Sequence, residues 1–326
     1  MPRPPLIIYG NTNITQIAMK NCMKNNIITI QKNPELRELL LDKCSQTTIK
    51  INEKEYPIDT NIHIDIDTSK VYTNDFPHHL EKTKPKVVIL IICHYSEMNM
   101  MMLDILRRQI RRNQGIYYYI VASRFSQTNP KEVELDNDII FVNQKEAYFN
   151  ILNKTLKAME YINNVLKIEY DFLIRTNVST VINIPKLLNE LAGIPREKIC
   201  IGGNKMQINW ICPGYGINDN RYKGRWFIQG TSIVFSKDVC EDIIKNQHKI
   251  EKTIVDDISL FMYLSNFNKN AYKSINNYSI SFYECSQDIS ELHTIPKGFA
   301  FYRNKTENMR DDDITRMRYL CMEGNL

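Results

Sequence analysis

The sequence predicts an α/β protein. We expect a three-layer α/β/α domain with a mostly parallel central sheet at residues 85–326, preceded by a small α+β accessory domain at residues 1–84. The run KVVILIICH (86–94) is continuously apolar, as in strands buried on both faces of a parallel sheet. Further apolar runs alternate with longer amphipathic stretches, which is typical of strands joined by right-handed crossover helices. The length of 326 residues also favours two domains.

The first 84 residues predict a short strand at 6–9, a helix at 34–42 and two alternating strands at 47–52 and 61–67. A linker at 75–85, with two prolines among charged residues, follows them. The histidines and aspartates of this region suggest a metal site, but alternation on a strand that faces water explains them better. These residues are His63, Asp65, Asp67, His78 and His79.

From residue 86 onward we predict four strands, at 86–94, 116–123, 138–143 and 170–177. The predicted helices lie between and after these strands, and the last begins with a proline in its first turn. They run to about residue 112, over 147–165 and over 185–192. In such a sheet, ligands bind at the carboxyl ends of the strands. The polar residues that follow those ends are His94, Tyr95, Ser123, Arg124, Arg175, Thr176 and Asn177.

Composition excludes several classes of protein. A hydrophobic fraction of 43% and a charged fraction of 24% are those of a globular chain. The eight cysteines show no spacing for zinc or a compact disulfide framework, and the turn CHYSEMN lacks the glycines of a dinucleotide-binding loop. The net charge of +5 comes without a nucleic-acid-reading motif, so we expect no nucleic-acid partner. A basic stripe at 107–112 is either a solvated helix face or a phosphate contact.

The N-terminal apolar run is too short for a signal peptide or a membrane anchor, so we expect a cytoplasmic protein without a transmembrane segment. The eight cysteines are then reduced thiols.

Four blocks, at residues 170–191, 225–244, 253–264 and 297–320, together resemble the β-1,3-galactosyltransferase/Fringe-like glycosyltransferases of the GT-A type, including relatives from giant viruses. The first block is a strand that ends in a basic residue, Thr and a triplet, followed by a Pro-led helix. The second is centred on a glycine, the third begins a helix with an acidic pair, and the last is a basic tail segment. The resemblance implies a nucleotide-sugar donor, most often a UDP-sugar, and a glycan or protein acceptor. A viral source would place the protein in the host cytoplasm or the virion.

The chain departs from the family at its acidic triplet, which is Asn177-Val178-Ser179 here. In the family, carboxylates at this site hold Mg²⁺ or Mn²⁺ against the diphosphate, and hard cations prefer anionic oxygens. Asn177 and Ser179 bring no charge, so a divalent metal has weak support unless Asp171, Asp256 or Asp257 reaches the site.

The departing nucleoside diphosphate still needs a positive partner. The resemblance places Arg175, Arg303 and Lys305 near it, so these residues could replace the metal. The alternatives are that Arg175 pairs with Asp171 or with a surface carboxylate, and that Arg303 and Lys305 are merely solvated. The donor-binding residues expected on this basis are His94, Tyr95, Arg124, Arg175, Asn177, Ser179, Arg303 and Lys305.

The acidic pair at the helix start predicts the catalytic base. Asp257 matches the base of the family and Asp256 lies beside it; alternatively, one or both only cap the helix. The glycine-centred segment implies acceptor contacts from Trp226, Gln229, Gly230 and Thr231. Trp210 and Tyr215, in the long connection 202–224, could stack on a sugar or belong to the core.

The expected function is therefore an inverting hexosyl transfer from a UDP-sugar. The alternative is a catalytically inactive protein that binds a nucleotide or a glycan, which would account for the lost triplet. A glycoside hydrolase is disfavoured because no motif specifies two opposed carboxylates. Residues 1–84 serve either acceptor choice or homodimer formation.

Overall fold

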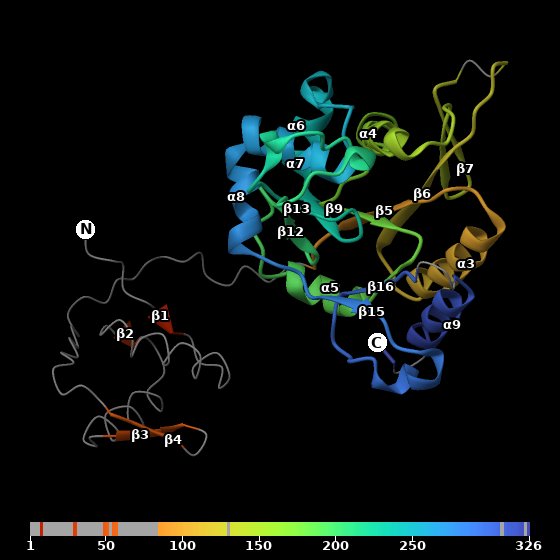
Figure 1. Ribbon diagram of the computed structural model, residues 1–326. Coiled ribbons are helices and arrows are strands. Elements are labelled where there is room, and N and C mark those ends of the chain that lie inside the picture. The colour runs from red at the N-terminus through yellow and green to blue at the C-terminus, as the bar shows by residue number, and fades with distance from the viewer. Residues whose placement is uncertain are drawn as a thin grey trace. The chain divides into compact units, whose positions relative to one another are not determined.

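The computed structural model describes four short strands within the first 57 residues, and then residues 84–128, 131–306, 310–322 and 325–326 (Figure 1). The chain divides into two units, Met1–His78 and His79–Leu326. In the first unit, β1 (Ile7–Ile8) pairs in parallel with β2 (Thr29–Ile30), and β3 (Thr48–Ile51) pairs antiparallel with β4 (Lys54–Pro57). The predicted helix at 34–42, the strand at 61–67 and most of the linker lie outside the described residues, as do His63, Asp65, Asp67, His78 and His79.

A seven-stranded sheet forms the middle layer of the second unit, in the order β11-β14-β9-β5-β6-β8-β7. Strands β9, β5, β6 and β8 are mutually parallel, while β14 and β7 run antiparallel to their neighbours. This confirms the predicted α/β class with a mostly parallel sheet. The bounds are β5 (Val87–Ile92), β6 (Ile116–Ser123), β7 (Val133–Asp136), β8 (Ile139–Val142), β9 (Phe172–Asn177), β11 (Cys200–Gly202) and β14 (Ile233–Ser236).

Helices cover both faces of this sheet, because successive side chains of a strand point to opposite sides. Val88, Leu90 and Ile92 of β5 pack in one core with α4 (Ile151–Glu160), α6 (Lys237–Lys245), α7 (Asp256–Phe267) and α8 (Lys269–Asn277). The alternate residues of β5 pack in a second core with α3 (Glu97–Arg111), α5 (Ile184–Leu191) and α9 (Arg310–Leu320). Figure 1 shows these two groups of helices on opposite sides of the strands.

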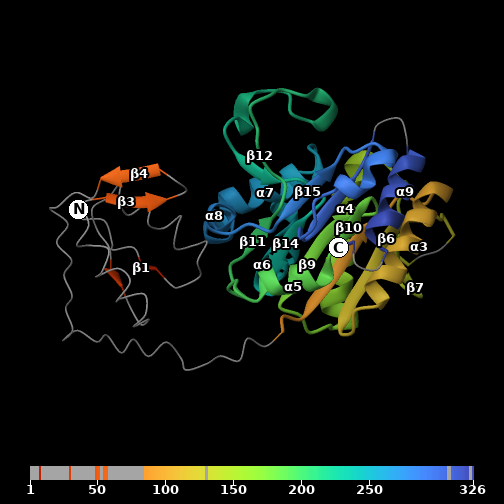
Figure 2. The same cartoon turned by 90° about the horizontal axis from the view of Figure 1, so that it is seen from below.

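A smaller sheet joins the C-terminal part of the chain to the carboxyl end of β9. Its order is β10-β16-β15, with β10 (Thr180–Ile182), β16 (Phe301–Asn304) and β15 (Phe282–Cys285). Strand β10 begins three residues after β9 ends and pairs antiparallel with β16, which sets Thr180 opposite Arg303. Figure 2 shows β10 beside the end of β9, and a separate hairpin that contains β12 (Lys205–Gln207) extending away from the sheet. In that hairpin β12 pairs with β13 (Trp226–Ile228).

Three predictions about local structure need correction. The helix predicted at 147–165 consists of a 3-10 turn, η1 (Tyr148–Asn150), then α4, then a π-helical segment, η2 (Tyr161–Leu166), that ends at the left-handed Lys167. The edge strand β7 was not predicted, because its sequence VELD is too polar to stand out. Val255, rather than either aspartate, is the N-cap residue of α7. The proline expected at the start of α5 is confirmed.

The described part of the chain contains no helix with the length and apolar character that crossing a bilayer requires.

Candidate active site

The carboxyl ends of β5, β6 and β9 lie at one edge of the sheet because the three strands are parallel neighbours. His94, Arg124 and Asn177 therefore come to the same edge, as the sequence predicts. Asp171 lies at the opposite end of β9, where it accepts hydrogen bonds from the backbone of Lys86 and from Arg196. Asp171 therefore cannot supply the missing carboxylate.

Arg303 contacts the side chains of Asn177 and Ser179. Its Nη1 donates hydrogen bonds to Oδ1 of Asn177 and, at 2.9 Å, to Oγ of Ser179. The hydroxyl of Thr180 donates to the same Asn177 oxygen at 2.9 Å. The side chains of Asn177 and Ser179 are thus oriented by a guanidinium, and the pairing of β10 with β16 carries that guanidinium to them.

The charge of Arg303 has no carboxylate partner among the described residues. Burial, together with the nearby charges of Arg310 and Arg175, lowers the pKa of Arg303 to about 10, against the opposing effects of Glu284 and Asp313. Arg310 and Arg175 each have an acidic partner, Asp313 and Asp256 respectively. Arg303 is therefore a half-buried cation that an anion would stabilise.

These residues do not fit a divalent metal ion. The oxygens of Asn177 and Ser179 are neutral and accept hydrogen bonds from a cation, which would repel Mg²⁺ or Mn²⁺. Over residues 84–128, 131–306 and 310–322, no three His, Cys, Asp or Glu side chains are grouped so that they could hold a metal.

Arg175 at the carboxyl end of β9 is buried and forms an ion pair with Asp256. Its second terminal nitrogen donates to the carbonyl oxygen of Gly230. A Cβ at position 230 would overlap the guanidinium, so the close approach requires glycine. Both expected alternatives for Arg175 are wrong, since its partner is neither Asp171 nor a surface carboxylate. Arg175 fixes the start of α7 against β9, and Asp256 neutralises its charge.

Asp257 lies beside the Arg175–Asp256 ion pair, and two backbone N–H groups fix its orientation. Its Oδ2 accepts from the backbone N–H of Gly230 at 3.1 Å, and its Oδ1 accepts from the N–H of Ile258 at 2.8 Å. Burial and then the charge of Asp256 raise the pKa of Asp257 to about 6, while Arg175 and the two N–H groups oppose the rise. Asp257 is only half-buried, so a carboxylate poised near neutral pH is open to a reactant.

The residues expected near the nucleotide occupy the ends of β5 and β6. His94 and Tyr95 are exposed, and the Tyr95 ring lies 6.5 Å from that of Phe141. The guanidinium carbon of Arg124 lies 3.4 Å from the centre of the same Phe141 ring. Lys305 is exposed and forms no hydrogen bond with Asn177 or Ser179 in the described part of the chain.

Most side chains of the glycine-centred segment that were expected to bind an acceptor instead contact other residues of the protein or are buried. Trp226 lies under Lys205, whose Nζ is 4.5 Å from the ring centre. The Gln229 side chain accepts from Asn204 at 2.6 Å, and Thr231 is buried. Of the four residues expected to touch an acceptor, Gly230 is the one whose described hydrogen bonds include Asp257.

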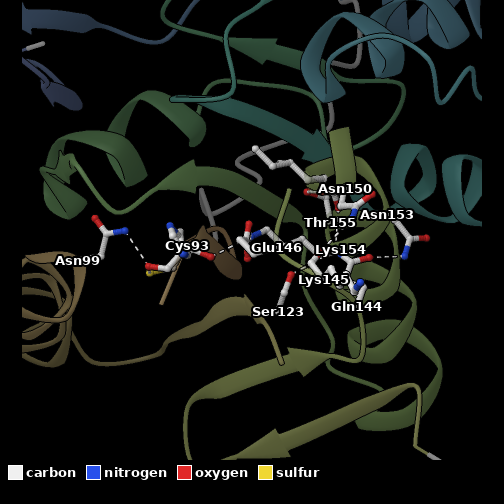
Figure 3. Close-up of polar contacts among 12 residues, drawn as sticks. Cys93, Asn99, Ser123, Gln144, Lys145, Glu146, Asn150, Asn153, Lys154 and Thr155 are labelled. Atoms are coloured by element: carbon white, nitrogen blue, oxygen red, sulfur yellow. Dashed lines mark hydrogen bonds and ion pairs between the residues drawn. The ribbon is translucent and has the colours of Figure 1, made fainter. Parts of the chain in front are cut away.

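A buried ion pair behind this edge was not predicted. Lys154 of α4 is fully buried, and its Nζ binds the Cys93 carbonyl oxygen at 2.8 Å and the carboxylate of Glu146 at 2.7 Å (Figure 3). It ties the carboxyl end of β5 to the segment before α4. A lysine in an amphipathic helix is normally exposed to solvent, so nothing in the sequence indicated that Lys154 is buried.

Comparison with protein families matches residues 121–274 to the Galactosyltransferase family. The matched span runs from β6 into α8 and includes Arg175, Asn177, Gly230, Asp256 and Asp257. Arg303 lies outside it. No curated protein matches the chain significantly. The family match supports a galactosyltransferase-like glycosyltransferase, in agreement with the resemblance of the four sequence blocks.

Proposed function

We propose that this galactosyltransferase-like chain transfers a hexose from a nucleoside diphosphate sugar, by resemblance a UDP-sugar, to an acceptor hydroxyl, with inversion at the anomeric carbon. The support is the family match over residues 121–274, together with the Arg303 guanidinium, which has no ion-pair partner in the described part of the chain, and the Asp257 carboxylate near the same edge of the sheet. The resemblance adds the GT-A arrangement, in which donor and acceptor meet at that edge.

The observation that carries the proposal is the contact of Arg303 with Asn177 and Ser179. As the bond between the sugar C1 and the diphosphate oxygen breaks, negative charge accumulates on the diphosphate. Arg303, which forms no ion pair within the described residues, offers a positive charge where the acidic triplet of the resemblance would hold a metal ion. No step of this reaction requires a divalent cation.

Asp257 is the base in this scheme. Its carboxylate takes the proton from the acceptor hydroxyl as that oxygen attacks C1 from the face opposite the leaving diphosphate. The products are the inverted glycoside, the nucleoside diphosphate and protonated Asp257, which returns its proton to solvent. One carboxylate suffices for a single displacement. The hydrogen bonds from Gly230 and Ile258 fix its orientation.

The test combines binding and turnover without metal. UDP binding is measured by calorimetry in EDTA, and nucleoside diphosphate release from a panel of UDP- and GDP-sugars is measured for wild type and Asp257→Asn. We expect UDP to bind, release to persist in EDTA, and Asp257→Asn to bind UDP normally but to lose activity by about 10²-fold or more.

Strict dependence on Mn²⁺ would contradict the role given to Arg303. UDP binding without any turnover in wild type would instead identify a nucleotide-binding protein with no transferase activity.

A further inference from the structure

Four aromatic side chains from two separate segments form a continuous surface, which we call the aromatic wall. Tyr148 and Phe149 belong to η1, and Trp210 and Tyr215 belong to the connection between β12 and β13. The ring centres of Tyr148 and Tyr215 are 6.0 Å apart, those of Trp210 and Tyr215 are 5.8 Å apart, and those of Tyr148 and Phe149 are 6.0 Å apart. Contacts between the rings thus join segments that are more than sixty positions apart in the chain.

The aromatic wall stands next to Asp257. The carbonyl oxygen of Tyr215 accepts a hydrogen bond of 3.1 Å from the N–H of Val255, two residues before Asp257. Gly216, with a φ of +76°, lets the turn press against the backbone of Thr253 and Ile254, where a side chain would collide. From the other segment, burial and then the charge of Asp257 raise the pKa of Tyr148.

The rings are open to solvent rather than part of the core. Tyr148 is 53% exposed, Phe149 41% and Tyr215 42%. In the described residues, neither tyrosine hydroxyl of the wall, nor the indole N–H of Trp210, takes part in a hydrogen bond. The wall therefore presents apolar faces with polar groups at their edges.

The segment that carries Tyr148 and Phe149 is rigidly held (Figure 3). Glu146 is paired with the buried Lys154, and Asn150 donates to the carbonyl oxygen of Lys145 at 2.9 Å. Gln144 donates to the carbonyl oxygen of Asn150 at 2.9 Å and accepts from Asn153 at 2.6 Å. Exposed rings on so constrained a turn are preorganised, which lowers the entropic cost of binding.

We infer that the aromatic wall binds the apolar face of a sugar ring, so that the acceptor is a saccharide, with its attacking hydroxyl directed at Asp257. This inference rests on the proposed function. A pyranose has a C–H face for the rings and hydroxyls for the phenol groups and the carboxylate. A lipid chain would gain from the rings but would lose hydration beside the Asp256–Asp257 pair, and an acidic peptide would be repelled by it.

The test measures saccharide binding without donor, by saturation-transfer NMR on an array of mono- to tetrasaccharides. Tyr148→Ala and Tyr215→Ala are compared with Tyr117→Ala, which removes a ring of similar exposure (55%) at the amino end of β6, far from the site edge. We expect about tenfold weaker saccharide binding in each wall variant, no change in Tyr117→Ala, and wild-type affinity for UDP in all three.

Failure of this inference is distinguishable from failure of the proposed function. Wild-type protein that binds UDP but no saccharide of the array overturns the inference alone, as does unchanged saccharide binding in both wall variants. Loss of UDP affinity in the wall variants also overturns it, because the rings would then belong to the donor site. Wild-type protein that binds saccharide but neither binds UDP nor releases it from a sugar nucleotide overturns the proposed transfer reaction.

Discussion

Arg303 donates a hydrogen bond of 2.9 Å to the hydroxyl of Ser179, although 124 positions separate the two residues in the chain. By the sequence resemblance, Ser179 corresponds to a metal-binding carboxylate; in this protein the position carries a neutral hydroxyl oxygen that accepts a hydrogen bond from Arg303. The contact depends on the register of β10 against β16, which sets Thr180 opposite Arg303.

Removal of this cation should weaken nucleotide binding. A hydrogen bond to a charged group contributes about 1.5–3 kcal/mol, so Arg303→Gln should raise the Kd for UDP about 10- to 100-fold. Calorimetry in EDTA measures it. Lys305→Gln is the matched control, because Lys305 is exposed and should leave Kd within about twofold. If both substitutions raised Kd equally, the nucleotide would be held by the net positive charge of the region rather than by a direct contact with Arg303.

The pH profile should report the ionisation of Asp257. Its pKa is raised to about 6 by burial and by Asp256, and only the ionised carboxylate can take a proton. We therefore expect kcat/KM to rise about tenfold per pH unit below pH 6 and to level off above it. Asp256→Asn removes the neighbouring negative charge, so in that variant the rise should shift to lower pH. An unchanged pH profile in Asp256→Asn would show that Asp256 does not raise the pKa of Asp257.

The buried ion pair of Arg175 and Asp256 should dominate local stability. Asp256→Asn leaves the guanidinium buried without its counter-charge, which costs about 3–5 kcal/mol of the free energy of unfolding. Urea denaturation measures the change. Asp219→Asn, which breaks the exposed pair with Arg221, should leave the denaturation midpoint unchanged. A small effect of Asp256→Asn would mean that water reaches Arg175.

Gly230 should tolerate no side chain. In Gly230→Ala the new Cβ overlaps the Arg175 guanidinium, so Arg175 or the backbone at position 230 must move, which displaces the N–H that donates to Asp257. We expect a loss of about 2 kcal/mol or more in stability and a large loss of activity. Gly214→Ala is the control, since its nearest neighbour would be the Cys212 sulfur at 3.9 Å. Gly230→Ala should therefore unfold at a lower temperature and turn over more slowly than wild type, whereas Gly214→Ala should match wild type in both measurements.

Lys154 should stabilise the turn that carries the aromatic wall. Lys154→Met leaves Glu146 without its partner and should lower the free energy of unfolding by about 3 kcal/mol. The further change Glu146→Gln should restore part of that loss, because the unpaired charge is then gone. A double variant as unstable as the sum of its two single variants would show that the pair is not coupled.

The sequence predicted the central strands well, because β5 is an uninterrupted apolar run buried along its whole length, and β6 and β9 each contain a shorter apolar run. Edge strand β7 was not predicted, because its four residues, VELD, alternate two apolar with two acidic side chains and form no continuous apolar run. The π-helical segment η2 was also not predicted, because the spacing of apolar residues does not distinguish a π-helix from an α-helix.

For the site, the resemblance named Asn177, Asp257 and Arg303, and the fold brings Arg303 onto Asn177. The partner of Arg175 could not be foreseen, because the ion pair with Asp256 spans 81 positions and depends on how the start of α7 packs against β9 in the tertiary structure. Lys154 and Tyr148 were overlooked for a different reason. A lysine in a helix and a tyrosine in a connection have unremarkable explanations until their neighbours in space are known.

The chain order of β9, β10 and β16 also determines when the contact between Arg303 and Asn177 can form during synthesis. A ribosome releases Asn177 long before Arg303, and every strand of the seven-stranded sheet precedes β16 in the chain. A nascent chain can thus bury its main core before Arg303 reaches Asn177. The guanidinium that we propose to hold the donor diphosphate is then added late, after most of the folding free energy has been gained.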